Sequence, residues 1–298
     1  MSFLDISEEI RQLGAKAEKA VRPYFDAIDE ISEYNTEKVL AAFAKNRVAE
    51  VMFAGTTGYG YDDKGRDTLD QIYADIFGTE AALVRIGFVN GTHALCCAMY
   101  SAVKTGDVVL SATGPAYDTL MNTITGDMAG SMKQYGIGYR QVEMKNGLPD
   151  VPAIAEAAKA EDVKLVFIQR SKGYGVRESL SCEQIGEVCQ AVRAVNKDAV
   201  IMVDNCYGEF VEKLEPTQGA CRHDNLILIS RHVPRNRRHE GIHRCARLNA
   251  LAEAAQRFRL AKCNGLNDVM ARIFWQRMYF ESHHLHDLCA EHGGLDDA

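Results

Sequence analysis

The stretch Ala-Val-Ile-Met-Val-Asp-Asn-Cys at residues 199–206 decides the fold class, because an unbroken apolar run stops at a carboxylate. Such a run is typical of a strand that is buried on both faces, as in a parallel sheet covered by helices. A carboxylate at the carboxyl end of that strand lies where open α/β sheets bind ligands. Ionised there, Asp204 needs a cationic partner, and a protonated ring nitrogen of a heterocyclic cofactor would serve. The alternative is an aspartate that only caps the turn through residues 205–208.

Strand and helix patterns alternate along most of the chain, which predicts an α/β fold with a mostly parallel sheet and helices on both faces. We expect strands at 81–85, 107–111, 139–143, 164–169 and 199–204. The intervening helices are expected at 91–104, 117–124, 151–159 and 182–195.

Three regions follow from these patterns. Residues 1–50 form an N-terminal helical segment, in which one helix from residue 5 ends at 34–36 and a second begins at Thr36. Residues 51–217 form the α/β domain, which opens with a glycine-rich stretch and a helix that ends near Phe77.

Residues 218–298 are atypical in composition. Eight of the nine histidines lie there, and Lys262 is the only lysine that follows Lys213. Apart from an amphipathic helix predicted at 247–262, the segment has no βα pattern. So abrupt a change marks either a domain boundary or residues that were never selected to fold.

Charge and composition exclude several classes of protein. A net charge of −7 argues against non-specific nucleic-acid binding and gives no support for binding to an anionic membrane. No apolar run is long enough to span a bilayer, and the first residues do not have the pattern of a signal peptide. Nine cysteines in such a chain favour a reducing cytoplasm, and their spacing matches no zinc site.

Three polar or aromatic features follow expected strands. Gly91 and Thr92 open a helix whose first amides could bind a phosphate; the alternative is that Asn90 only caps that helix without a ligand. Tyr117 could stack on a flat cofactor or only pack over the sheet edge. Arg170 begins a basic loop that could face an anionic substrate or, alternatively, solvent.

Five motifs follow one another between residues 58 and 210. They are Gly-Tyr-Gly-Tyr-Asp-Asp-x-Gly-Arg-Asp at 58–67, Gly-Thr-His-Ala at 91–94, Ala-Tyr-Asp-Thr-Leu at 116–120, Gln-Arg-Ser-x-Gly-Tyr at 169–174 and Val-Asp-Asn-Cys-Tyr-Gly-Glu-Phe at 203–210. Their order and spacing resemble the methionine gamma-lyase family, which includes aluminium resistance proteins. The resemblance covers about residues 5–217 and implies a pyridoxal-phosphate enzyme of the aspartate-aminotransferase fold.

The resemblance implies a role for five residues. Gly91 and Thr92 would hold the cofactor phosphate, Tyr117 would stack on the pyridine ring, and Asp204 would pair with the pyridinium nitrogen. Tyr61 looks like the tyrosine that related lyases lend to the phosphate site of a neighbouring subunit. The partners implied are therefore a small amino-acid substrate and further copies of the chain in a homo-oligomer.

The implied activity is carbon-sulfur bond cleavage in a sulfur amino acid such as methionine or cystathionine. The family carries a lysine about 25 residues after the aspartate, which forms a Schiff base with the cofactor. That position falls near Ser230, but no lysine lies between Lys213 and Lys262, and no glycine-rich run follows. The resemblance therefore predicts an incomplete family domain with no catalytic lysine and little or no activity.

Two explanations of this departure remain open. We hypothesise that the reading frame shifted near Gln218, so that residues 218–298 are translated out of frame. The rival is a genuine alternative C-terminal domain. For function, the alternative to a lyase is a non-catalytic remnant that binds pyridoxal phosphate or only keeps the scaffold. Lys172 and Lys213 do not match the expected lysine position.

Overall fold

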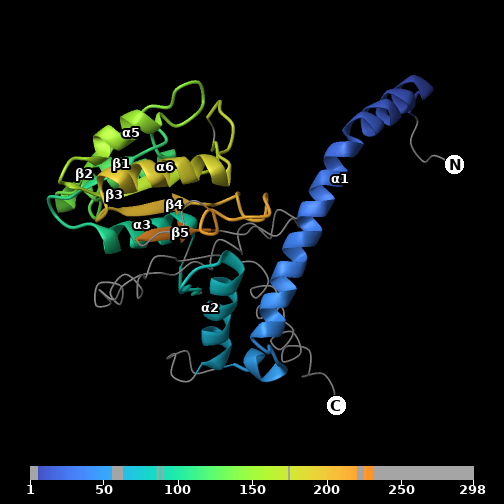
Figure 1. Ribbon diagram of the computed structural model, residues 1–298, viewed down its shortest axis with the longest axis horizontal. Helices are drawn as coiled ribbons and strands as arrows, with labels where there is room; N and C mark the ends of the chain where they lie inside the picture. Colours follow the sequence, from blue (N-terminus) through green and yellow to red (C-terminus); the bar gives the residue numbers. More distant parts are fainter. Residues whose placement is uncertain are drawn as a thin grey trace, which may run out of the picture.

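A sheet of parallel strands forms the centre of the protein (Figure 1). The computed structural model describes residues 6–55, 63–85, 87–88, 90–173, 175–219 and 225–230. Every pair of neighbouring strands is parallel, and the order is β2-β1-β3-β4-β5. The strands are β1 (Val108–Ser111), β2 (Gly138–Gln141), β3 (Val163–Gln169), β4 (Val200–Asp204) and β5 (Leu226–Ile229).

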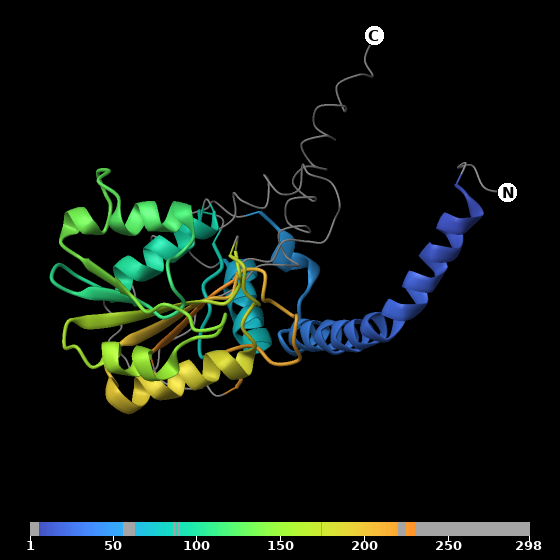
Figure 2. The ribbon, with the colours of Figure 1, turned by 90° about the horizontal axis from the view of Figure 1, so that it is seen from above.

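Helices cover both faces of this sheet (Figures 1 and 2). Alternate side chains of each strand point to opposite faces, so each strand contributes to two apolar layers. In β3, Val166 and Ile168 pack in the layer that contains α5 (Val151–Ala158) and α6 (Cys182–Val195). Leu165 and Phe167 pack in the layer of α3 (Gly91–Ala102) and α4 (Asp118–Thr125). The predicted α/β class is confirmed.

The N-terminal segment is one helix, α1 (Glu8–Lys45), rather than the two helices expected from sequence. The predicted break at Asn35 and Thr36 is wrong, because neither side chain caps a helix there. The Asn35 amide donates to the carbonyls of Phe210 and Glu212, and the Thr36 hydroxyl donates to the carbonyl of Ser32. These bonds leave the backbone helix intact. No helix in the described ranges has both the length and the apolar character needed to cross a membrane.

The second helix, α2 (Lys64–Phe77), packs beside the C-terminal half of α1 (Figure 1). It begins at the cap Asp63, whose carboxylate accepts from the Arg66 amide, and ends at Gly78 in the left-handed conformation. Two short 3₁₀ helices complete the described elements: η1 (Glu50–Phe53) and η2 (Lys133–Tyr135).

Residues 81–85 do not form the predicted strand. The Val84 amide donates to the Asp70 carboxylate at 2.7 Å, and the Arg85 guanidinium forms an ion pair with the same carboxylate. The segment is therefore held against α2 by a side chain instead of a neighbouring strand. A short apolar run in the sequence does not show that the Asp70 side chain takes the place of a neighbouring strand as hydrogen-bond partner.

The sheet also extends beyond residue 217, where no strand was expected. In β5, Leu226 pairs with Ile201 and Ile229 pairs with Asp204, so the last strand lies in parallel register beside β4. All four β5 residues are buried. The predicted helix at 247–262 lies outside the described residues.

Candidate cofactor site

The candidate site lies at the carboxyl ends of the parallel strands. The chain passes from β1 outward to β2 and then returns to β3 on the other side of β1, so the strand order reverses between β1 and β3. Open α/β sheets bind ligands at such a reversal point. Gln169 at the end of β3 is paired in register with Asp204 at the end of β4.

Asp204 is almost fully buried, with 3% of its surface exposed. One carboxylate oxygen accepts from the Cys206 amide at 3.0 Å, so the predicted turn cap is present. Burial raises the pKa of Asp204 from 3.8 to about 6, because the hydrogen bond from the Cys206 amide offsets only part of the cost of burying the charged carboxylate. Within the described ranges, no lysine or arginine forms an ion pair with this carboxylate. Asp204 is therefore a buried acid that a cationic ligand would stabilise in its charged form.

The N-terminus of α3 lies at the same edge of the sheet. Asn90 caps this helix, with its side-chain oxygen accepting from the His93 amide at 2.8 Å. Gly91 is buried, and Thr92 is half-buried at the first turn. The Asn90 cap, which the sequence analysis gave as the alternative to phosphate binding, is therefore present. It leaves other amides of the first turn available for an anion at the positive end of the helix dipole.

Tyr117 contacts both the first turn of α3 and the end of β3. Its phenol lies 3.1 Å from the Thr92 hydroxyl, and its amide donates to the Gln169 side chain at 3.3 Å. Burial raises the pKa of Tyr117, and the charge of Asp204 raises it further. Tyr117 and Asp204 lie at the same point of the sheet edge, because Gln169, which accepts from the Tyr117 amide, is the register partner of Asp204. The ring also packs against the apolar layer under α3, as the alternative interpretation predicted.

Four of the five predicted site residues therefore gather at one edge of the sheet: Gly91, Thr92, Tyr117 and Asp204. The fifth, Tyr61, lies outside the described residues. This set fits a flat group that carries a cationic ring nitrogen and an anionic phosphate. The fit rests on the burial of the Asp204 carboxylate, which accepts from the Cys206 amide and forms no ion pair with a lysine or arginine of the described ranges.

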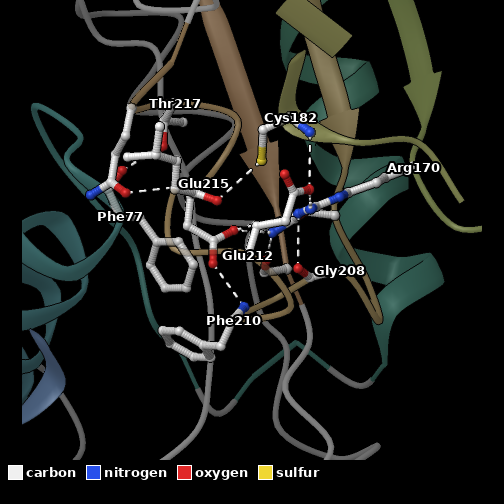
Figure 3. A network of polar contacts seen from close by, with 12 residues as sticks. Phe77, Arg170, Cys182, Gly208, Phe210, Glu212, Glu215 and Thr217 are labelled. Atoms are coloured by element: carbon white, nitrogen blue, oxygen red, sulfur yellow. Dashed lines mark hydrogen bonds and ion pairs between the residues drawn. The ribbon is translucent and has the colours of Figure 1, made fainter. Parts of the chain in front are cut away.

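Arg170 lies neither beside a substrate site nor in solvent, the two positions expected from the sequence. It is buried with 1% exposed, so it faces neither solvent nor an open substrate site. Its guanidinium donates to the Asn205 side chain at 2.6 Å and to the Gly208 carbonyl at 2.8 Å, and it forms an ion pair with Glu212 (Figure 3). Arg170 thus ties the end of β3 to the loop that follows Asp204.

Glu215 completes this arrangement from the far end of the same loop (Figure 3). Its carboxylate accepts from the Phe210 amide and from the Asn205 side-chain amide, at 2.8 and 3.0 Å. Burial raises the pKa of Glu215, while Arg170 and Lys38 oppose that rise. Sequence analysis did not predict these contacts, because acids in a loop after a strand are equally common in exposed turns.

Asn205 also reaches the end of β5. Its side-chain amide donates to the Ser230 hydroxyl at 3.0 Å, and Ser230 is buried. Ser230 is the residue near which the family resemblance places a lysine. It follows β5 directly, one residue beyond the register partner of Asp204, at the edge of the sheet that carries the candidate site.

Fold and site together define a class: an α/β protein of the aminotransferase-like fold found in pyridoxal-phosphate-dependent lyases. The family model described as methionine gamma-lyase matches residues 10–222, and the chain therefore belongs to the methionine gamma-lyase family.

Several known proteins are similar to this chain. The chain is 43% identical over 213 residues to the uncharacterized protein YnbB of Bacillus subtilis. The alignment covers 70% of this chain and 50% of YnbB. It is 41% identical to a carbon-sulfur lyase involved in aluminum resistance from Clostridium novyi NT, with a TM-score of 0.67 over 71% of this chain and 51% of that one. A proposed cystathionine beta-lyase involved in aluminum resistance from Clostridium acetobutylicum is 45% identical, with a TM-score of 0.68 over 71% and 51% of the two chains. The chain thus spans about half the length of these relatives.

Proposed function

We propose that this chain binds pyridoxal phosphate at the carboxyl edge of its sheet and is the cofactor-binding part of a carbon-sulfur lyase. The observation that carries the proposal is the buried carboxylate of Asp204, whose pKa is raised to about 6 beside the phenol of Tyr117. Family membership and a relative named as a carbon-sulfur lyase support the class of reaction. The substrate class is a sulfur amino acid such as methionine or cystathionine.

The residues of the site have the following roles in this proposal. Asp204 holds the proton on the ring nitrogen, since a charged carboxylate at that point favours the cationic ring. Amides at Gly91 and Thr92 would bind the phosphate, and Tyr117, whose hydroxyl forms a hydrogen bond with Thr92, would stack on the ring. When bound, pyridoxal phosphate supplies an electron sink that stabilises negative charge on the substrate.

We also propose that this chain has no counterpart of the Schiff-base lysine that the family resemblance implies near Ser230, so that it binds the cofactor without a covalent bond and has little or no lyase activity. Two other lysines do not replace it. Lys213 directs its ammonium toward the Tyr34 ring on α1, at 5.7 Å from the centroid, and Lys172 is exposed after β3. A non-catalytic protein that binds the cofactor is the outcome this arrangement favours over an active lyase.

The family match also bears on the region after residue 218. It ends at residue 222, close to the point where the composition changes. This coincidence supports our proposal that the segment from about residue 218 derives from a shifted reading frame. Sequencing the corresponding DNA from several isolates tests it: correcting the frame should restore a lysine and a glycine-rich run, and an intact single frame without them would contradict it.

Borohydride reduction separates covalent from non-covalent binding. The wild-type chain is incubated with pyridoxal phosphate, reduced, digested and analysed by mass spectrometry, beside Ser230→Lys and the same variant with Asp204→Asn. We expect no site-specific adduct in the wild type and an adduct at position 230 in Ser230→Lys, which Asp204→Asn diminishes.

Two results would contradict the proposal. A stoichiometric wild-type adduct at Lys172 or Lys213 would show that another lysine has taken over. Failure of the wild type to retain pyridoxal phosphate in equilibrium dialysis would show that the chain keeps the fold of the family but does not bind the cofactor.

A further inference from the structure

The loop between β3 and α6 carries an arginine, Arg177, that forms no ion pair with an acid of the described residues. Its side chain is half-buried. The guanidinium donates to three main-chain carbonyls, those of Gln169, Ser171 and Glu178, at 2.9, 2.6 and 2.8 Å. Carbonyls hold a cation in place but do not cancel its charge. Burial lowers the pKa of Arg177, yet an arginine keeps its proton at neutral pH, so the loop holds a positive charge in a fixed position.

The Arg177 guanidinium lies at the gap between the carboxyl ends of β1 and β3. Within a strand, the N–H and the C=O of one residue point to the same side. The Gln169 amide donates to the Thr113 hydroxyl in the loop after β1, so the Gln169 carbonyl that Arg177 contacts faces this gap as well. The strand order reverses here, and open α/β sheets bind their ligands at such a reversal.

Gln169 also links Arg177 to the candidate cofactor site. The Gln169 side chain accepts from the Tyr117 amide at 3.3 Å, and Gln169 is the register partner of Asp204. One residue thus contacts Arg177 through its carbonyl and Tyr117 through its side chain. Arg177 therefore lies at the same edge of the sheet as the residues that would hold the cofactor ring.

The first and last arginines of this loop differ in how their charge is balanced. Arg170 is buried beside two acids, since its guanidinium forms an ion pair with Glu212 and lies 3.7 Å from the Glu215 carboxylate. Arg177 has only carbonyl partners within the described part of the chain. Its remaining N–H groups can donate to an anion, and a planar guanidinium matches the two oxygens of a carboxylate.

We propose that Arg177 binds the carboxylate of an amino acid held at the cofactor site, so that the site prefers amino acids to amines without a carboxylate. Arg177 can do so only if the chain binds pyridoxal phosphate, so this role rests on the proposed function. The phosphate of the cofactor is assigned to the first turn of α3 and does not compete for the guanidinium. Lys172, another cation of the loop, is exposed, so water screens its charge more strongly.

The affinities for two stable conjugates test this role, with binding rather than turnover as the readout. In N-phosphopyridoxyl-methionine a secondary amine joins the cofactor skeleton to the amino acid. The matching conjugate with methylthiopropylamine is the same molecule without the carboxylate. Titration calorimetry on the full chain measures both dissociation constants. The wild type should bind the conjugate that carries the carboxylate at least about tenfold more tightly, because a partly buried guanidinium forms charge-assisted hydrogen bonds with it.

Two substitutions separate carboxylate binding from a structural role of Arg177 in the loop. Arg177→Gln should abolish the preference and leave the affinity for the conjugate without a carboxylate within about twofold of the wild type. Arg177→Lys keeps the charge but not the planar set of donors, so a preference of about threefold should remain. Lys172→Gln removes the same charge from an exposed position of the same loop and serves as the matched control. It should show the wild-type preference.

Several results would overturn this role. They are equal affinity of the wild type for the two conjugates, a preference that persists in Arg177→Gln, and a preference that is lost in Lys172→Gln. A further one is an equal weakening of both conjugates by both Arg177 substitutions, which indicates a structural role alone. In all these cases a wild type that retains pyridoxal phosphate leaves the proposed function intact. A wild type that binds neither the conjugates nor pyridoxal phosphate would overturn the proposed function together with this role.

Discussion

Replacing Asp204 with asparagine should stabilise the cofactor-free protein at neutral pH. Burial raises the pKa of this carboxyl from 3.8 to about 6, so the folded state binds the proton more tightly than the unfolded state. The free energy of unfolding of the wild type should therefore fall as pH rises from about 4, and the loss should be complete somewhat above pH 6. The rise in pKa corresponds to about 3 kcal/mol.

Asparagine keeps the acceptor for the Cys206 amide but carries no charge, so the variant avoids this loss. Urea unfolding at a series of pH values measures the effect. We expect the advantage of Asp204→Asn over the wild type to grow by about 2 to 3 kcal/mol between pH 4 and pH 8. Asp198→Asn, in the exposed turn before β4, serves as the control and should show no such trend.

Saturating pyridoxal phosphate should reduce the stability advantage of Asp204→Asn over the wild type. A cationic ring nitrogen beside Asp204 favours the charged carboxyl, so the cofactor should stabilise the wild type more than the variant. A pH-independent difference between the cofactor-free proteins would refute the idea that Asp204 is a buried acid without a compensating charge.

Three further substitutions test the surroundings of Asp204. Tyr117→Phe removes the 3.1 Å hydrogen bond to Thr92 and should lower the free energy of unfolding by about 1 kcal/mol while weakening cofactor binding, whereas unchanged binding would argue against a role for the phenol. Arg170→Lys cannot donate to all of the acceptors that the guanidinium contacts, so the free energy of unfolding in urea should fall by about 3 kcal/mol or more. A fall below about 1 kcal/mol would show that these contacts are dispensable for stability. Gly208→Ala places a methyl carbon 2.5 Å from the Arg170 side chain and should lower the free energy of unfolding by about 1 to 3 kcal/mol. An unchanged free energy of unfolding would contradict the close packing of this loop.

Part of the fold could be predicted because local and tertiary signals agree. The apolar run of β4 is long and ends sharply, and α6 begins at a capping box formed by Ser181 and Gln184. Asn90 likewise caps α3 at the expected place. In these elements the residues that favour the local structure are also those that the core buries, so sequence pattern and structure coincide.

The remaining elements depend on partners that are distant in sequence. Asn35 was interpreted as a helix end, but its amide bonds to carbonyls near residue 211, about 175 positions away. Arg170 was expected to face a ligand or solvent, yet its partners come from the loop after β4. A single sequence does not show such pairings, because the same residue types are equally common in exposed turns.

The candidate site was predicted as a set of residues rather than as a geometry. Sequence motifs singled out Gly91, Thr92, Tyr117 and Asp204, and the structure brings these four together. Gln169 was missed because a glutamine at a strand end gives no chemical signal by itself. Its contact with the Tyr117 amide arises only from the reversal of strand order between β1 and β3.

The affinity for pyridoxal phosphate, compared between the wild type and Asp204→Asn, tests the central claim most directly. Equilibrium dialysis at neutral pH, with Asp198→Asn as the control, measures both dissociation constants. The account predicts that the wild type and the control bind alike and that Asp204→Asn binds at least about tenfold more weakly, since the pyridine ring loses its anionic partner. Equal affinity in all three proteins, or no binding by the wild type, would contradict it.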